Sequence, residues 1–319
     1  MPARRALLLS ALAAPAARAQ APDWPNRPIR IVVPHAAGGG NDVIARLIGD
    51  WLRPALGQPI VVENRTGANG VVGAEVVARG DPDGHLFLLI ARTHAMNRYA
   101  MGTLPFHPVQ DFSAITLIAR FPLVLAAHAG ASLNSVADVI ARARAEPGRL
   151  GFGISEAFVH YTSELFARMA GIEIVQVPYR GSALILNDLV AGHVPLGWVS
   201  PLSVLPHLQS GRIRPIAVTT AGRVALLPDV PAIAESGLPG YEASGLYGLV
   251  GPTSLPPGIA ERLHAAIAQA IAEPGRRARL ESFGLEVALE GPVGFRRFLD
   301  QDDALWASAS RDGLVPRSH

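Results

Sequence analysis

Short apolar runs alternate along the chain with segments whose apolar residues recur at helical spacing. The first run is Ile29–Val33, and the segment after it places Ile44, Ile48, Leu52 and Leu56 four positions apart. The run predicts a buried strand, and the spacing predicts an amphipathic helix. Further strands are expected at 59–64, 85–91, 121–127, 150–154, 172–179, 194–199, 213–220 and 246–252. Further helices are expected at 67–79, 135–145, 158–169, 182–192 and 256–272.

This alternation favours an α/β fold in which helices cover both faces of parallel sheets. About nine or ten strands are too many for one open sheet of this length, so we expect two doubly wound α/β lobes. The chain is expected to cross between them near 120–122 and again near 244–247. We therefore assign residues 20–120 and 247–319 to lobe 1, and residues 121–246 to lobe 2.

Composition and charge narrow the class of protein. Hydrophobic residues make up 49% of the 319 positions, which is enough for real cores. The formal net charge is only +2, and no block of like charges is present, so we expect no nucleic-acid partner. The absence of cysteine excludes disulfides, thiolate metal sites and a cysteine nucleophile.

The N-terminus reads MPARRALLLSALAAPAARAQ, a basic pair followed by a short apolar segment. Ala17, Arg18 and Ala19 form an A-x-A cleavage pattern. We expect a secretory signal peptide at 1–19 and a periplasmic mature protein; the alternative is an alanine-rich disordered tail. The arginine pair permits either general or twin-arginine export. The C-terminal GLVPRSH fits a truncated protease-site tag or a native tail equally well.

Residues 34–42 read PHAAGGGND and join the first strand to its helix. Ligands bind at this edge of open α/β sheets, and glycines at a helix start let an anion reach backbone N–H groups. The spacing is not G-x-G-x-x-G, and no Gly-Lys-Ser/Thr follows, so no dinucleotide or P-loop site is expected. The charge of Asp42 disfavours a phosphate, which leaves a carboxylate as the expected anion. A tight turn before a helix capped by Asn41 or Asp42 is the structural alternative.

Other candidate residues follow later strands. Arg92 and Thr93 would share the sheet edge, where Arg92 could hold a carboxylate with two hydrogen bonds or lie in solvent. Ser155 could donate to a ligand or cap a helix, and Tyr179 could present its hydroxyl to a cleft. No metal site or cofactor is expected, since H-E-x-x-H is absent and the histidines are scattered. No G-x-S-x-G or catalytic triad can be assigned either.

Several ordered blocks resemble the Bug family, the periplasmic receptors of tripartite tricarboxylate transporters. They include WPNRPIRIVVPHAAGGGNDVIARLI, LGQPIVVENRTGANGVVGAE, VPYRGSALILNDLVAGHV and LPDVPAIAESGLPGYE. The resemblance runs from about Trp24 to the C-terminus. It implies a type II periplasmic binding protein fold, in which two lobes close over a small carboxylate.

The resemblance also implies a set of ligand-binding positions. They are the first loop, read here as His35, Ala36, Ala37, Gly38, Gly39 and Gly40, with Arg92, Thr93, Ser155, Tyr179, Val199, Ser200 and Tyr247. His35, Ala36 and Ala37 depart from the usual P-F-P-P-G-G loop, and Glu156 stands where relatives carry small donors. Val199 replaces an aspartate that can meet an ammonium group, which argues against an amino-acid ligand and for a monocarboxylate or aromatic carboxylate.

We therefore expect a monomeric receptor that is not an enzyme and that passes a small organic carboxylate to membrane transporter subunits. Two other classes stay open on the sequence: an α/β hydrolase or transferase acting on a carboxylate derivative, and an orphan sensor or interaction module. Turnover of an ester or thioester would favour the enzyme. No thermal shift with any anion would favour the interaction module.

Overall fold

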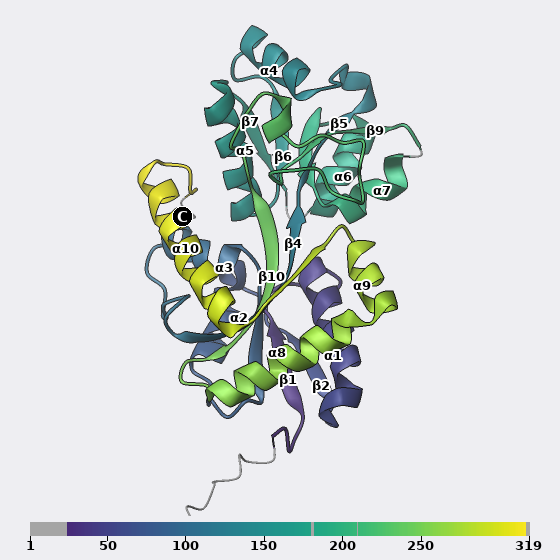
Figure 1. The fold of residues 1–319 in the computed structure, drawn as a ribbon. Coiled ribbons are helices and arrows are strands. Elements are labelled where there is room, and N and C mark those ends of the chain that lie inside the picture. The colour runs from purple at the N-terminus through teal and green to yellow at the C-terminus, as the bar shows by residue number, and fades with distance from the viewer. Residues whose placement is uncertain (1–23, 180–181, 209, 317–319) are drawn as a thin grey trace, which may run out of the picture.

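The computed structural model describes residues 24–179, 182–208 and 210–316, which form two β-sheets surrounded by helices (Figure 1). The expected signal peptide lies outside these residues. The larger sheet has the order β11-β4-β10-β3-β1-β2. Its strands are β1 (Ile29–Val33), β2 (Ile60–Asn64), β3 (Leu86–Ile90), β4 (Phe112–Pro122), β10 (Ser244–Pro252) and β11 (Glu286–Glu290). The helices of this lobe are α1 (Gly40–Leu56), α2 (Val71–Ala78), α3 (Thr93–Ala100), α8 (Pro257–Ala272), α9 (Pro274–Glu281) and α10 (Pro292–Arg311).

The smaller sheet forms the second lobe, in the upper half of Figure 1, with the order β7-β6-β8-β5-β9. Its strands are β5 (Val124–His128), β6 (Gly151–Ile154), β7 (Val175–Pro178), β8 (Leu196–Val199) and β9 (Ile213–Val218). Its helices are α4 (Val136–Ala145), α5 (Ala157–Ala170), α6 (Ser182–Ala191) and α7 (Pro201–Leu208). The expected two-lobe α/β architecture is confirmed; the exact lobe boundaries stay a prediction.

Both sheets are mixed, and the expectation of parallel sheets is wrong in this respect. Strand β1 runs parallel to β2 and β3, but β10 is antiparallel to both β3 and β4. In the smaller sheet β6 is parallel to β7 and β8, while β5 is antiparallel to β8 and β9. Strands β4 and β10 carry the chain out of the first lobe and back, so they run in opposite directions. Their sequences do not show this difference in direction, because a strand buried on both faces is a continuous apolar run in either direction.

The two expected crossings between lobes are confirmed. Strand β4 ends at Pro122, β5 begins at Val124 in the other sheet, and the returning chain pairs Ser244 with Pro122. Thr219 joins both crossings: its hydroxyl accepts the Leu123 N–H at 2.8 Å, and its carbonyl accepts the Ala243 N–H at 2.9 Å. The two connections therefore lie side by side, as a hinge between lobes requires.

Several elements were not anticipated. The expected strand 121–127 is two strands, and the first of them begins at Phe112. Helices α3, α7, α9 and α10 and strand β11 also went unpredicted. Helix α10 does carry a helical period, since Phe295, Leu299 and Trp306 are buried on one face, so the sequence held a signal for it. Helix α1, in contrast, matches its prediction. Its four spaced apolar residues are all buried, and Gly57 ends it with φ 68°, a left-handed conformation that suits glycine.

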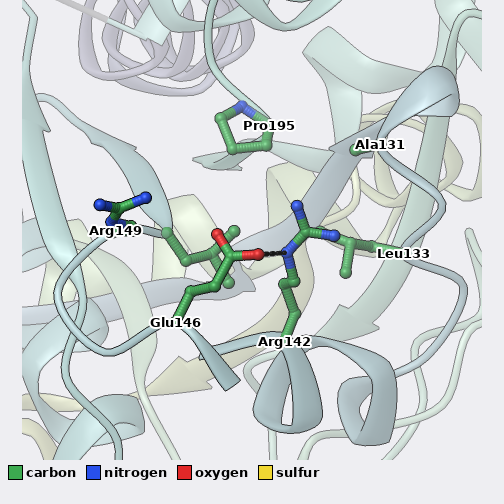
Figure 2. Close-up of a pocket in the computed structure, with 7 residues that line it drawn as sticks. Ala131, Leu133, Arg142, Glu146, Arg149 and Pro195 are labelled. Carbon is green, nitrogen blue, oxygen red and sulfur yellow. Dashed lines mark ion pairs between the residues drawn. The ribbon is translucent and has the colours of Figure 1, made fainter. Parts of the chain in front are cut away.

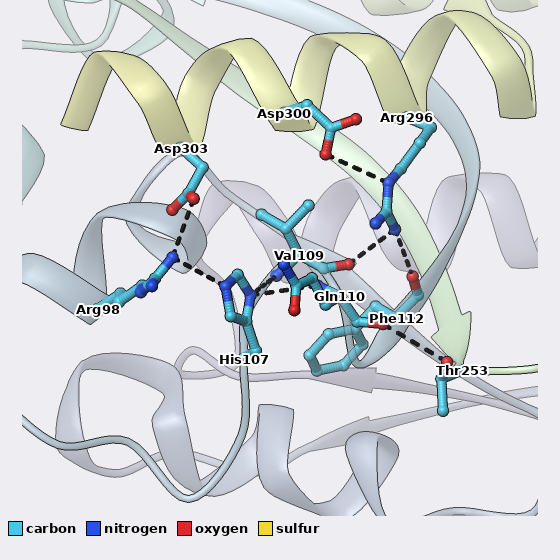
Figure 3. A network of polar contacts seen from close by, with 9 residues as sticks. All are labelled: Arg98, His107, Val109, Gln110, Phe112, Thr253, Arg296, Asp300 and Asp303. Carbon is cyan, nitrogen blue, oxygen red and sulfur yellow. Dashed lines mark hydrogen bonds and ion pairs between the residues drawn. The ribbon is translucent and has the colours of Figure 1, made fainter. Parts of the chain in front are cut away.

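Helix α10 lies along one side of the molecule and reaches from the first lobe to α5 of the second (Figure 1). Polar contacts tie it to α3 and to the segment before β4 (Figure 3). Arg98 bridges His107 and Asp303 at 2.8 and 3.0 Å, and Arg296 donates to the carbonyls of Val109 and Phe112. These contacts attach the start of the outgoing crossing strand to the C-terminal helix.

The end of the chain packs onto the second lobe. Trp306 is fully buried, with its ring 4.7 Å from that of Tyr161 and 6.4 Å from that of Phe158, both on α5. Leu314 and Val315, from the tail that resembles a tag, are buried in the same cluster. This apolar contact is a third connection between the lobes, formed by side chains alone.

Candidate functional site

A cleft of about 730 Å³ lies between the lobes, within the size range of sites for small molecules. Both lobes and both crossing strands contribute to it. Its lining comprises His35, Ala36, Gly38, Gly39, Gly40, Asn41, Val43, Ile44, Ala91, Phe121, Leu123, Ser155, Glu156, Val159, Ser182, Trp198, Ser200, Pro201, Tyr247, Phe283 and Leu285.

The starts of four helices meet at this cleft. Gly39, Gly40 and Asn41 begin α1, while Glu156, Ser182 and Pro201 stand at the starts of α5, α6 and α7. The first turn of each helix has N–H groups without partners inside the helix, and its dipole is positive. The described lining residues include no lysine or arginine. The cleft therefore favours an anion held by N–H groups and helix dipoles.

The glycine loop brings Tyr247 close to the start of α1. A side chain at Gly40 would place its Cβ 2.3 Å from the Tyr247 hydroxyl oxygen, closer than any real contact. The Tyr247 ring stacks on Phe121 with centroids 4.7 Å apart, so both crossing strands support it. Glycine at position 40 thus allows a hydroxyl from the hinge to lie against the N-terminus of a helix.

Asp42 braces the loop and is not the helix cap. Gly39 is the N-cap, and the Asp42 carboxylate accepts hydrogen bonds from Gly38 N at 2.9 Å, Asn64 at 3.0 Å and Arg46 at 3.0 Å. Burial alone would raise the pKa of Asp42, but these donors outweigh it and lower that pKa. The expectation that Asn41 or Asp42 caps the helix is wrong, because the carboxylate turns back to hold the glycine turn.

His35 lies at the mouth of the same loop. The Asn41 side-chain amide contacts His35 Nδ1, while Nε2 is buried without a hydrogen-bond partner among the described residues. Burial lowers the pKa of His35, so the ring is neutral near pH 7. If the Asn41 amide donates to Nδ1, the neutral ring carries its proton on Nε2, an atom that the surrounding protein buries.

Glu156 is the one acidic side chain among the described lining residues. It is exposed to the space of the cleft, yet protein lies on both sides of it, and this desolvation raises the pKa of its carboxyl. Burial also raises the pKa of Tyr247, and the charge of Glu156 adds to that rise. The acid and the phenol are therefore within electrostatic reach of each other.

Some predicted site residues lie away from the cleft lining. The Arg92 guanidinium pairs with Asp302 at 2.7 Å, donates to the Ser244 carbonyl at 2.8 Å and lies over the Trp306 ring. Thr93 is buried at the start of α3, and Ala37, though in the loop, is not part of the lining.

Two further predicted residues belong to the second lobe. Tyr179 donates its hydroxyl to Asp188 at 2.7 Å, and burial, with Asp188 next, raises its pKa to about 12. Val199 is fully buried in the apolar core of that lobe. The cleft does bring together His35, Ala36, Gly38, Gly39, Gly40, Ser155, Ser200 and Tyr247.

The residues that sequence reasoning missed are mostly apolar. Phe121 and Leu123 come from the first crossing, Trp198 from β8, and Phe283 and Leu285 from the turn after α9. Their apolar character signals burial in any core, so nothing in the sequence distinguishes a cleft wall from a lobe interior. Together they give the cleft an apolar surface besides its polar loop and Glu156.

A second, smaller pocket of about 190 Å³ lies beside α4 and shares no lining residue with the cleft (Figure 2). Its charged residues are Arg142, Glu146 and Arg149, with Arg142 and Glu146 paired at 3.3 Å. Both paired side chains are about half exposed, as is usual for a solvated helix surface. No group of metal-ligating side chains occurs in the described part of the chain.

The fold and the cleft define a two-lobe α/β binding protein. Residues 44–308 match the tripartite tricarboxylate transporter family receptor. The protein BugT of Bordetella pertussis is 32% identical over 93% of this chain and 92% of its own length. The structure titled R. palustris Rpa4515 with adipate has a TM-score of 0.84 and 36% identity, covering 92% of this chain and all of that one. MatC (Rpa3494) from Rhodopseudomonas palustris with bound malate has a TM-score of 0.79 and 28% identity, covering 90% and 100%.

The chain therefore belongs to the family of tripartite tricarboxylate transporter receptors, and the resemblance seen in the sequence is confirmed. Its fold is that of the periplasmic binding proteins, two α/β lobes joined by two crossing strands. Members of this family are periplasmic solute-binding receptors and not enzymes, which answers the hydrolase or transferase alternative.

Proposed function

We propose that this protein captures a small organic carboxylate in the cleft and delivers it to the membrane subunits of a tripartite tricarboxylate-type transporter. The observation that carries the proposal is the convergence of four helix starts on a cleft whose described lining has no cationic side chain. Such a site holds an anion through N–H groups and dipoles. The adipate and malate named for two similar structures are anions of this class.

The proposed binding set follows the cleft. The α1 loop, from His35 to Asn41, holds the carboxylate together with Tyr247. Ser155 and Ser200 contribute from the second lobe, and the apolar wall contacts the body of the ligand. Arg92 has a structural role in this proposal, because its guanidinium is already paired with Asp302. Ligand contacts to both lobes favour the closed state about the hinge.

Delivery to a transporter requires export, which the N-terminal signal pattern provides in this proposal. No helix in the described part of the chain is long and apolar enough to cross a membrane. We expect a monomer, because closure of two lobes about a hinge completes the site within one chain. Loss of ligand uptake in cells lacking this receptor, restored by the wild-type gene, would support transport; unchanged uptake would favour an orphan sensor.

Binding is tested by thermal denaturation with a panel of mono-, di-, tri- and aromatic carboxylates. A ligand present at 100 times its Kd adds about 2.7 kcal/mol to the free energy of unfolding, an easily measured rise in Tm. At least one carboxylate should stabilise the protein, and matched amines and alcohols without a carboxylate should not. Stabilisation by no member of the panel would overturn the proposal and favour an interaction module.

A further inference from the structure

Glu156 places a carboxylate inside a cleft that is otherwise built for an anion. It is the N-cap residue of α5, but its side chain makes no hydrogen bond to the N–H groups of that helix. No described residue forms an ion pair with it, although most acids of the first lobe are paired with arginine. The side chain is exposed, and Glu156 is part of the cleft lining.

Its surroundings place this carboxylate near the anion end of the site. The charge of Glu156 acts on Tyr247, and the Tyr247 hydroxyl lies against Gly40 at the start of α1. One part of the cleft is therefore positive and a neighbouring part negative. The same cleft also has an apolar surface, to which Phe121, Leu123 and Trp198 contribute.

A carboxylate ligand at the α1 loop thus brings its remaining groups toward Glu156. A second carboxylate there would face like charge in a partly desolvated space, which disfavours binding. A protonated amine would instead form a charge-assisted hydrogen bond with Glu156. The negative group and the apolar wall together match a molecule with a carboxylate, an apolar body and an ammonium group.

We propose that Glu156 is a specificity residue that selects carboxylates bearing a protonated amine and rejects dicarboxylates. This inference rests on the proposed carboxylate-binding function and names its substrate class. It also reverses the expectation drawn from Val199, since that side chain is fully buried in the lobe core and does not line the cleft. The charge that meets an ammonium group comes from α5 in this chain.

The test uses four six-carbon carboxylates: hexanoate, adipate with a second carboxylate at the far end, 6-aminohexanoate with an ammonium group at the far end, and norleucine with an ammonium group beside the carboxylate. Titration calorimetry on the mature protein should show at least one aminated probe binding tenfold or more tighter than hexanoate and adipate. Glu156→Gln should remove that preference and strengthen adipate relative to the aminated probe. Glu173→Gln is the matched control, because Glu173 is an exposed acid before β7 at the opposite end of the same sheet.

The outcomes separate the two proposals. Adipate binding as tightly as the aminated probes, or an unchanged ranking in Glu156→Gln, overturns the role of Glu156 while leaving carboxylate binding intact. Failure of all four probes and of the wider carboxylate panel overturns the proposed function itself. Circular dichroism and the Tm of the ligand-free variants establish that both glutamine variants are folded.

Discussion

The two lobes meet in two different ways: across the open cleft, and through the apolar packing of α10 against the second lobe. Helix α5 takes part in both. Toward the cleft it presents Glu156 and Val159, which border space that a ligand can fill. Away from the cleft Phe158 and Tyr161 pack against the fully buried Trp306 of α10. One helix therefore borders the cleft at its start and packs against the C-terminal helix on its other face.

The acids on the two sides differ in the same way. Asp302 is buried and has two partners, the Arg92 guanidinium at 2.7 Å and the Trp306 indole N–H at 2.9 Å. Glu156 faces the cleft with no ion-pair partner among the described residues. A buried acid paired with a buried arginine holds structure together, whereas an acid in a cleft without an ion-pair partner is available to a ligand.

Trp306→Ala should have the largest effect on stability, because it leaves a cavity where α10 packs against α5. Loss of a buried tryptophan costs about 3–5 kcal/mol in the free energy of unfolding, measured by urea denaturation. Leu305→Ala is the control on the same helix, since Leu305 is 40% exposed and should change stability by less than about 1 kcal/mol. Equal effects of the two variants would contradict the packing role of Trp306.

Asp302→Asn should come next, because it leaves the Arg92 guanidinium, itself largely buried, without its charged partner. Removing one member of a buried pair typically destabilises a protein by about 3 kcal/mol. Asp300→Asn breaks an exposed pair with Arg296 on the same helix and should cost about 0.5 kcal/mol or less. Urea denaturation of both variants measures the contrast, and a mild Asp302 variant would show that this pair does not hold the hinge to α10.

Gly40→Ala moves the test to the cleft side and should act mainly on binding. The added Cβ would collide with the Tyr247 hydroxyl oxygen, so the tyrosine or the start of α1 must shift. We expect at least a tenfold loss of carboxylate affinity, about 1.4 kcal/mol, by titration calorimetry. Gly258→Ala introduces the same methyl where nothing lies within 4 Å and should bind like the wild type. Unimpaired binding by Gly40→Ala would place the anion elsewhere.

Glu156→Gln should have the smallest effect on stability. Folding raises the pKa of Glu156, so the protonated side chain favours the folded state. This contribution to the free energy of unfolding is fully present below the ordinary glutamate pKa and is lost as the pH rises through the raised pKa. The variant should therefore raise the Tm of the ligand-free protein by about 1 °C at neutral pH, a small effect because water screens the group. Near pH 4 the two proteins should melt alike. A lowered Tm at neutral pH would mean that the carboxylate stabilises the empty receptor.

The sequence predicted the parts of the site that depend on local backbone. The glycine loop, its position after a buried strand and its α1 helix all follow from residues close together in the chain. Ser155 and Ser200 also reach the cleft, because each follows a strand at the same edge of its sheet. Arg92 follows a strand too, but its partners Asp302 and Ser244 are distant in sequence, and no local pattern announces them.

The chain by itself determined the α/β class, the two lobes, their crossings and the family, since periodicity and ordered blocks are properties of neighbouring residues. Only the tertiary structure decided that the sheets are mixed, that Asp42 braces the loop, and that Val199 lies in a core while Glu156 faces the cleft. Strand direction and side-chain surroundings depend on residues far apart in the sequence. The sequence does not show whether an aspartate or glutamate side chain will pair with a buried arginine or face an open cleft. Those surroundings determine whether the carboxylate holds the structure together or is available to a ligand.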